Sequence, residues 1–255
     1  MIIDLCPVSG RRTVGEGIHI LSFSSASISR SVRAGQFVNI KVEEAADPLL
    51  RRPFSVYRVA GSDVEIVFNV VGKGTQALSQ KSRGDMIDVL GPLGVPFATG
   101  GSEFDTGVLV AGGLGVAPLP MLTAALHAAG KSILTFLGAR SAGQLIESHL
   151  ENLHLATEDG SRGFSGNVVA LARKTLAERP AKRPKIFGCG PTAMLRALAE
   201  LARTLGIPCE VSLEGPMGCG IGICQGCPVE LAGEEKKYAL MCKDGPTFDI
   251  RKIKI

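Results

Sequence analysis

The sequence predicts a multidomain β plus α/β protein, with an antiparallel β-barrel, a doubly wound parallel α/β domain and a small cysteine-rich domain. Three observations predict this fold class. Short apolar alternations broken by turn residues fill the first part of the chain, strand and helix patterns alternate in the middle, and four of the seven cysteines lie close to the C-terminus. We therefore expect three domains, at residues 1–98, 99–208 and 209–255.

Composition places the chain among ordinary globular proteins. Of its 255 residues 45% are apolar, and 28 basic and 24 acidic residues give a net charge of +4, which excludes an intrinsically disordered chain. Trp is absent, only two Tyr occur and no basic block is present, so we expect no nucleic-acid partner. Glycine is unusually frequent, with 32 residues, a content that favours tight turns and close backbone approach to ligands.

We expect a cytoplasmic protein without a membrane segment. The first residues lack the basic and apolar regions of a signal peptide. The uncharged stretch 107–129 is long enough to span a membrane, but its glycines and prolines indicate a buried strand, a turn and a helix. The odd number and uneven spread of the cysteines argue against a disulfide framework and favour a metal centre.

In the first domain, three segments alternate apolar and polar residues with the period of two that is typical of half-buried strands. They cover residues 17–23, 36–42 and 64–70, and their short spacing predicts an antiparallel barrel or sandwich. The turn-forming residues at 94–101 predict the end of this domain.

The middle domain repeats a strand followed by a helix. Such repeated β–α units imply a parallel sheet with helices on both faces. A capping-box pattern at 141–144 also predicts the start of a short helix. We predict strands at 108–111, 133–137, 153–157 and 185–188, and helices at 117–129, 168–179 and 192–205.

The strongest chemical signal is the spacing of four cysteines. Cys219 is followed by four residues and Cys224, then by two residues and Cys227, and Cys242 follows after fourteen more. This is the plant-type ferredoxin spacing of [2Fe–2S] ligands, and the intervening glycines let backbone amides approach the sulfurs. A structural zinc site is the alternative, although zinc ligands normally come as two short-spaced pairs.

Two motifs in the barrel region suit a diphosphate. Arg52 combines its planar guanidinium with the rigid backbone of Pro53, and Phe54 and Ser55 follow. Further along, the glycine-rich turn 72–75 leads into a helical segment predicted at 76–82, whose N-terminus would provide a second phosphate contact. A solvated loop is the alternative interpretation of the first motif.

Two glycine-rich turns follow predicted strands of the middle domain. At the carboxyl ends of parallel strands, glycines let the backbone approach a pyrophosphate while a helix N-terminus faces it. The candidate dinucleotide contacts are Gly112, Gly113, Gly115, Cys189, Gly190 and Pro191.

The order of these motifs resembles the ferredoxin–NADP reductase superfamily of flavin reductases. The cysteine segment 213–227 and the ending 242–248 resemble the electron-transfer subunit of class 1B dihydroorotate dehydrogenase, and the resemblance covers essentially residues 1–250. It implies FAD in the barrel, NAD on the α/β domain and a [2Fe–2S] cluster on Cys219, Cys224, Cys227 and Cys242. The FAD contacts that it implies are Arg52, Pro53, Phe54, Ser55, Phe68, Asn69, Val70, Gly74 and Thr75.

The resemblance implies electron transfer between NAD and a partner chain. That partner is an FMN-containing TIM-barrel catalytic subunit that oxidises dihydroorotate in pyrimidine (UMP) biosynthesis, with two copies of each chain in a heterotetramer. No acid–base catalytic residue is expected here, because the redox chemistry belongs to the cofactors. Two alternatives remain: a flavin and iron–sulfur subunit of another oxidoreductase complex (sulfide-, hydrogenase- or ferredoxin-linked), and a non-enzymatic, zinc-stabilised binding module.

Three further observations refine these expectations. Family members often carry Arg where Asn69 stands, which leaves one expected FAD phosphate contact open. Arg140 and Ser141, after the second strand of the middle domain, are compatible with NAD or NADP. The cysteine loop is apolar at Ile221 and Ile223, so we expect it to be partly exposed as a docking face for the partner.

Overall fold

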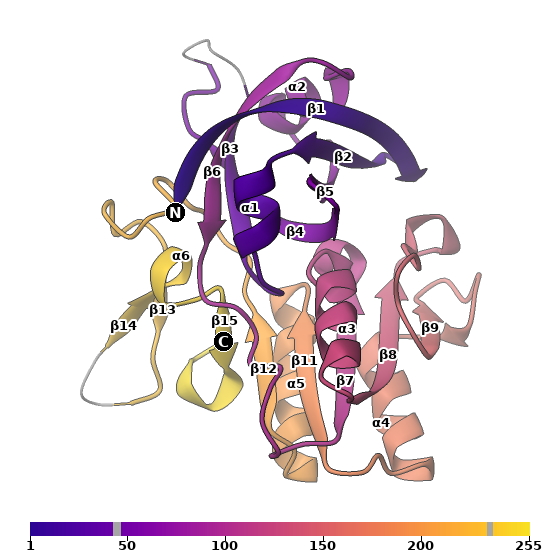
Figure 1. Ribbon diagram of the computed structural model, residues 1–255. Coiled ribbons are helices and arrows are strands. Elements are labelled where there is room, and N and C mark those ends of the chain that lie inside the picture. The colour runs from indigo at the N-terminus through magenta and orange to yellow at the C-terminus, as the bar shows by residue number, and fades with distance from the viewer. Residues whose placement is uncertain (43–46, 234–236) are drawn as a thin grey trace.

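The computed structural model describes residues 1–42, 47–233 and 237–255, and a barrel stands above a sheet-based part (Figure 1). The barrel is closed and antiparallel, with the strand order β1-β2-β5-β4-β3-β6, as the short alternating segments predict. Its elements are β1 (Ile2–Gly15), β2 (Ile18–Ser24), α1 (Ala26–Ser31), β3 (Phe37–Lys41), β4 (Arg52–Ala60), β5 (Asp63–Asn69), α2 (Lys73–Gln80) and β6 (Met86–Leu93).

Strand β3 shows how the barrel is joined to the rest of the molecule. Its residues Val38 and Ile40 are fully buried in the apolar core of the barrel. Successive side chains of a strand point to opposite faces, so Phe37 and Asn39 point out of the barrel. Both are nevertheless buried, and Phe37 packs in the apolar cluster of the sheet-based part. The outer face of this strand is therefore an internal contact surface.

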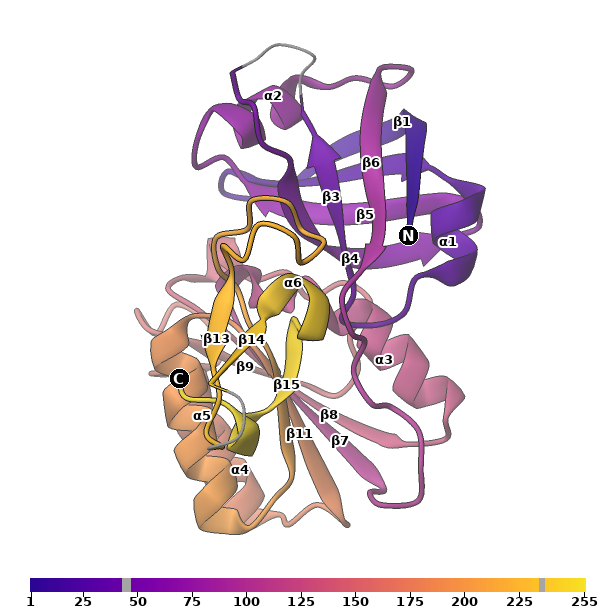
Figure 2. The same cartoon turned by 90° about the vertical axis from the view of Figure 1, so that its left-hand side faces the viewer.

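The second part is a seven-stranded sheet with the order β10-β9-β8-β7-β11-β12-β15. Neighbouring strands are parallel except β12 and β15, and α4 and α5 cover one face while α3 covers the other (Figure 2). This confirms the predicted doubly wound α/β arrangement. The elements are β7 (Thr106–Gly112), η1 (Gly113–Val116), α3 (Leu119–Ala128), β8 (Ser132–Ala139), β9 (Leu153–Thr157), β10 (Phe164–Ser165), α4 (Val168–Glu178), β11 (Pro184–Cys189), α5 (Thr192–Leu205), β12 (Cys209–Ser212) and β15 (Thr247–Asp249).

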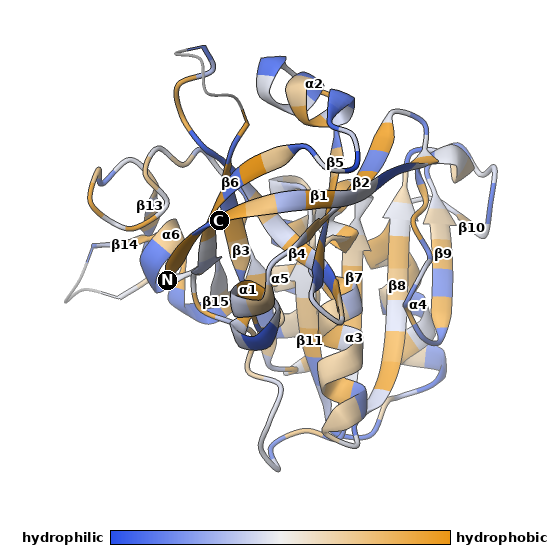
Figure 3. Ribbon diagram, turned by 45° about the horizontal axis from the view of Figure 1, so that its top comes forward, coloured by the Kyte–Doolittle hydropathy of each residue, from blue (hydrophilic) through white to orange (hydrophobic). Residues whose placement is uncertain are grey.

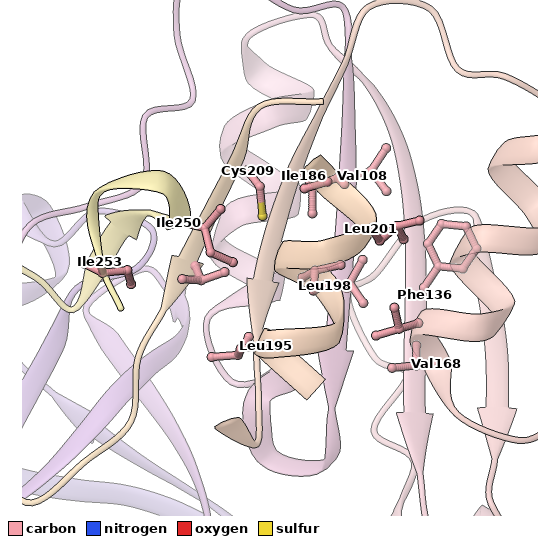
Figure 4. Packing of buried hydrophobic residues seen from close by; sticks show 14 of the residues in the cluster. Val108, Phe136, Val168, Ile186, Leu195, Leu198, Leu201, Cys209, Ile250 and Ile253 are labelled. Carbon is pink, nitrogen blue, oxygen red and sulfur yellow. The ribbon is translucent and has the colours of Figure 1, made fainter. Parts of the chain in front are cut away.

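Packing on α5 explains why the sheet extends into the C-terminal segment. The apolar face of this helix, with Leu195, Leu198 and Leu201, is buried in one cluster with Cys209 of β12 and Ile250 beyond β15 (Figure 4). Since a short segment gains most by burying its apolar residues against an existing core, the C-terminal residues complete the sheet.

The remaining C-terminal elements are β13 (Pro228–Glu230), β14 (Tyr238–Leu240), α6 (Met241–Asp244) and η3 (Ile250–Lys252). Strands β13 and β14 form a separate antiparallel pair. The loop between β12 and β13 carries three of the four motif cysteines and lies beside the barrel strand β3 (Figure 2). The cysteine loop therefore lies where the barrel and the C-terminal segment meet.

Helix α2 begins earlier than the sequence pattern predicts. It covers Lys73–Gln80 instead of 76–82, so the prediction of its bounds is wrong. The Thr75 hydroxyl accepts hydrogen bonds from the backbone N–H groups of Val71 and Gly72, at 2.9 and 3.2 Å. These bonds satisfy free N–H groups at the helix start and place Gly74 and Thr75 in its first turn.

The predicted capped helix at 141–144 is also wrong. Only a single 3₁₀ turn, η2 (Ala142–Gln144), forms there, and Ser141 makes no side-chain capping bond. The N–H of Ala142 donates to Ser161 Oγ at 2.9 Å instead. A contact from a distant residue has replaced the local cap.

Hydropathy follows this architecture (Figure 3). Strand β7, in the middle of the sheet, is hydrophobic along most of its length and almost completely buried, as a strand covered on both faces must be. None of the described helices combines the length and the apolar character that crossing a membrane requires.

Candidate functional site

A cavity of about 300 Å³ lies between the barrel, the sheet and the C-terminal segment. Gly74 stands behind its wall: a Cβ atom there would lie 3.1 Å from Arg52 Nε, so the glycine lets α2 approach the guanidinium closely. The wall includes Val71 but not the predicted Val70. The predicted FAD contacts that do line it are Arg52, Pro53, Phe54, Ser55, Phe68, Asn69 and Thr75.

The rest of this wall comes from residues that were not among the predicted FAD contacts. Phe37 reaches it from β3, and Leu114 and Ala117 reach it from the turn after β7. The C-terminal segment closes it with Leu213, Glu214, Gly215, Met217 and Pro246. Because residues 213–217 end two positions before the first motif cysteine, the cavity and the cysteine loop are neighbours along the chain.

A second cavity, of about 530 Å³, lies at the carboxyl ends of the parallel strands, where open α/β sheets bind ligands. Of the predicted dinucleotide residues, Gly112, Gly113 and Pro191 line it. Arg140 and Glu158, which follow β8 and β9, give this cavity one cationic and one anionic side chain.

The other predicted dinucleotide residues, Gly115, Cys189 and Gly190, lie behind the wall. A Cβ atom at Gly115 would lie 2.2 Å from the Cys189 carbonyl oxygen, and one at Gly190 would lie 3.1 Å from the backbone of Gly112. These glycines therefore allow the two strand-to-helix turns to pack directly against each other.

Cys189 contacts a carboxylate of the first cavity. Its Sγ lies 3.8 Å from Glu214 Oε1, and the Cys189 side chain is 1% exposed. Burial raises the pKa of the Cys189 thiol well above its ordinary value. Desolvation by the surrounding protein also raises the pKa of the Glu214 carboxyl, whereas the hydrogen bond with the Cys189 thiol lowers it. In the sequence, Glu214 is marked only as a member of the cysteine segment 213–227, and that segment assigns it no role.

The four motif cysteines are arranged as two pairs. The Sγ atoms of Cys227 and Cys242 are 3.3 Å apart, and the Cys224 thiol lies close enough to Cys219 to hydrogen-bond it. Within the described part of the chain, no three His, Cys, Asp or Glu side chains converge as ligands of one metal ion. Two thiol pairs suit a two-iron cluster better than a single zinc ion, which requires four ligands around one point.

The thiol pKa values of two of these cysteines are shifted in opposite directions. Burial opposes ionisation of Cys219, but the backbone N–H groups of Cys224 and Ile221 lower the pKa of its thiol to about 6. Burial, followed by the contact with Cys227, raises the pKa of Cys242 to about 12. Because the thiolate is the form that binds metal, Cys219 is prepared for binding and Cys242 must release a proton.

Fold and site together define a reductase of the ferredoxin–NADP reductase type joined to an iron–sulfur segment. Residues 214–254 match the iron–sulfur cluster binding domain of dihydroorotate dehydrogenase B. The dihydroorotate dehydrogenase B (NAD(+)) electron transfer subunit of Geobacillus kaustophilus (strain HTA426) is 37% identical over 248 residues, which cover 94% of both chains. That of Bacillus caldolyticus is 38% identical over 251 residues, with the same coverage. The chain belongs to this family of dihydroorotate dehydrogenase B electron-transfer subunits.

A solved structure with the same architecture is that of an NADH-dependent reduced ferredoxin–NADP oxidoreductase, described for flavin-based electron bifurcation. It is 33% identical, with a TM-score of 0.87, and the match covers 98% of this chain and 90% of the other. The comparisons confirm the resemblance noted in the sequence, the iron–sulfur segment, the reductase fold and the electron-transfer role.

Proposed function

We propose that this chain takes electrons from a partner that oxidises dihydroorotate and passes them through a [2Fe–2S] cluster and FAD to NAD⁺. The net reaction converts dihydroorotate and NAD⁺ to orotate, NADH and a proton. The partner is an FMN-containing TIM-barrel catalytic subunit, in a heterotetramer with two copies of each chain. None of the seven cysteines of this chain pairs in a disulfide, in keeping with a reducing compartment, the cytoplasm.

The observation that carries this proposal is the continuity between the first cavity and the cysteine loop. Glu214, Gly215 and Met217 line the cavity, and Cys219 follows two residues later. A flavin in the cavity and a cluster on the loop would therefore be close neighbours, as electron transfer between them requires. When bound, FAD exchanges a hydride with NAD and single electrons with the cluster.

The barrel side of the cavity offers what a flavin dinucleotide needs. Arg52 presents a planar guanidinium, suited to a diphosphate, next to the N-terminal turn of α2. Phe54 and Phe68, whose ring centroids are 5.8 Å apart, provide an apolar wall for a flat ring system. Asn69 also faces the cavity and offers a neutral amide, which binds a phosphate less strongly than a guanidinium does.

The second cavity suits the nicotinamide dinucleotide. Gly112 and Gly113 expose their backbone at the start of η1. The free N–H groups there can donate hydrogen bonds to a pyrophosphate. Glu158 disfavours an additional 2′-phosphate, whereas Arg140 favours one, and the NAD(+)-linked relatives support NAD. Comparing the dissociation constants of NADH and NADPH tests this preference.

The cysteine loop supplies the contact with the catalytic subunit. Ile223, between the cysteines, is 76% exposed, and an exposed apolar side chain beside a redox centre suits a docking face. We expect Ile223→Glu to weaken association with the catalytic subunit tenfold or more, while NADH oxidation by artificial acceptors persists. The matched control is Leu205→Glu, an exposed apolar residue at the end of α5. Equal weakening by both variants would contradict a specific docking role for the loop.

Anaerobic purification tests the proposal as a whole. We expect a coloured protein with flavin and iron–sulfur absorption, iron and acid-labile sulfide, and co-purification with a TIM-barrel flavoprotein. A colourless chain that contains zinc and no flavin would overturn the proposal.

A second function, in a ferredoxin-linked NAD(P)H complex, is supported by the 33% identity to the NADH-dependent reduced ferredoxin–NADP oxidoreductase. The partner distinguishes the two. Turnover of reduced ferredoxin, without turnover of dihydroorotate when the TIM-barrel flavoprotein is added, would favour the second function.

A further inference from the structure

Asn39 is a buried polar residue within an otherwise apolar stretch of β3. Its side chain is 0% exposed, and its Nδ2 donates a hydrogen bond of 3.2 Å to the carbonyl oxygen of Cys219, 180 residues further along the chain. Its Oδ1 is buried and accepts no hydrogen bond from the described residues. Asparagine is disfavoured in strands, and an unpaired buried amide oxygen destabilises the fold. The stability of the barrel therefore does not account for asparagine at this position.

The cysteine loop meets Asn39 with no space between them. Gly220, directly after Cys219, has a φ of 75°, a conformation that favours glycine. A Cβ atom on Gly220 would lie 2.5 Å from Asn39 Nδ2. The loop therefore adopts a backbone conformation that brings the Cys219–Gly220 peptide directly onto the Asn39 side chain.

The backbone of Asn39 is held from both sides. Across the sheet it pairs with Pro53, one of the residues that line the candidate flavin cavity. The Arg51 guanidinium lies 3.4 Å from the Asn39 carbonyl oxygen and pairs with the Asp88 carboxylate at 2.6 Å. Asn39 is thus fixed to the cavity wall through its strand and to the cysteine loop through its side chain.

We propose that Asn39 is a positioning residue that holds Cys219 at a set distance and orientation relative to the flavin cavity. It acts through the Cys219 peptide. By holding that carbonyl, it fixes the peptide plane between Cys219 and Gly220 and the start of the turn whose Ile221 N–H donates to Cys219 Sγ at 3.4 Å. Hydrogen bonds to cluster sulfurs tune the reduction potential, so Asn39 influences both the geometry and the potential of the site. This inference rests on the proposed cluster.

The substitution Asn39→Leu tests the proposal because it removes the donor at similar volume. We expect the variant to fold with a melting temperature within about 4 °C of the unaltered chain. In the metal-free protein, amide hydrogen exchange at residues 219–224 should accelerate about two- to tenfold, as expected for the loss of one hydrogen bond. In the loaded protein, the cluster should be lost to a chelator faster, with a changed reduction potential and electron paramagnetic resonance spectrum.

Asn39→Asp provides the second variant. It keeps the shape but turns an acceptor toward the Cys219 carbonyl oxygen, so we expect the same changes in loop exchange and cluster potential, with a larger shift in potential. The matched control is Asn152→Asp, because Asn152 Nδ2 also donates to a backbone carbonyl, that of Ile133, at 2.8 Å. Asn152 has a φ of 47°, which aspartate also tolerates.

The outcomes separate this inference from the proposed function. If the Asn39 variants leave loop exchange, potential and spectrum unchanged, or if the Asn152 control shifts them equally, the positioning role is overturned. If the unaltered chain holds no [2Fe–2S] cluster, the proposed function fails. In that case, faster amide hydrogen exchange at residues 219–224 in the metal-free Asn39 variants would still support the inference that Asn39 holds the cysteine loop.

Discussion

The two cavities differ in how their walls are built. The candidate flavin cavity, of about 300 Å³, draws its wall from the barrel, the turn after β7 and the C-terminal segment. The candidate dinucleotide cavity, of about 530 Å³, is confined to one end of the sheet and the adjoining turns and helices. A ligand in the first cavity would contact three parts of the chain at once, whereas a ligand in the second would contact only one. The difference suits a resident cofactor in the first cavity and an exchanging substrate in the second.

The largest effect is expected for Cys219→Ser, which removes one cluster ligand and leaves both cavities intact. We expect loss of the iron–sulfur spectrum and of electron transfer to the partner, with NADH oxidation by an artificial acceptor preserved. Cys6→Ser, a change at a thiol packed inside the barrel, is the control and should keep the cluster. A Cys219→Ser variant with a complete [2Fe–2S] spectrum would show that the ligand assignment is wrong.

Arg52→Ala tests the candidate flavin cavity. It removes a charge-assisted contact to the diphosphate, so FAD affinity should fall by about 1.5–3 kcal/mol, roughly tenfold or more. Flavin content after dialysis measures this loss, and Arg173→Ala on the exposed face of α4 should leave it unchanged. Unaltered flavin occupancy in Arg52→Ala would refute the role of the guanidinium.

Gly115→Ala tests the candidate dinucleotide cavity. The new methyl group would meet the Cys189 carbonyl oxygen at 2.2 Å and force apart the two turns beside the dinucleotide cavity. Such overpacking costs about 1–3 kcal/mol of folding free energy. Displacing the two turns relieves part of this strain, so we expect NADH to bind roughly tenfold more weakly while FAD is retained. Gly100→Ala is the control, because a Cβ atom there meets no atom within 4 Å. Loss of FAD with unchanged NADH binding would reverse the assignment of the cavities.

The smallest effect is expected for Glu214→Gln. The pKa of Glu214 is raised in the folded chain, so folding disfavours its charged form. At pH values below the ordinary carboxyl pKa, this group adds no pH dependence to the free energy of unfolding, because it is protonated in both the folded and the unfolded chain. As the pH rises from there through the raised pKa, the unaltered chain should lose stability relative to the Gln variant. Melting temperatures measured against pH check this trend, and a constant difference between the two proteins would contradict it. Glu200→Gln on α5 controls for the substitution itself.

The sequence pattern predicted those helix bounds that neighbouring residues in the chain determine. The bounds of α5, Thr192–Leu205, agree with the sequence pattern because Gly206, with a φ of 65°, ends the helix where the apolar periodicity stops. The start of α2 was wrong by three residues because the Thr75 hydroxyl bonds to backbone before the helix. Periodicity does not report such a side-chain contact.

The candidate sites divide in the same way. The residues Arg52–Ser55 are contiguous and lie on one strand, so a short motif was enough to place them in the cavity wall. Glu214 and Phe37 reach the same wall from elements that are far apart in sequence, and only the packing of the barrel against the sheet and the C-terminal segment brings them together. Asn39 carried one signal, a poorly strand-forming residue within an apolar strand, but its partner Cys219 follows from the tertiary fold alone.

The most direct test of the electron-transfer role is the reduction of NAD⁺ by dihydroorotate, measured with this chain alone and after addition of the FMN-containing catalytic subunit. We expect the chain alone to oxidise NADH with artificial acceptors but to show no dihydroorotate turnover. Adding the catalytic subunit should produce NADH and orotate in equal amounts. NADH formation from dihydroorotate by this chain alone, or none after the catalytic subunit is added, would contradict this role.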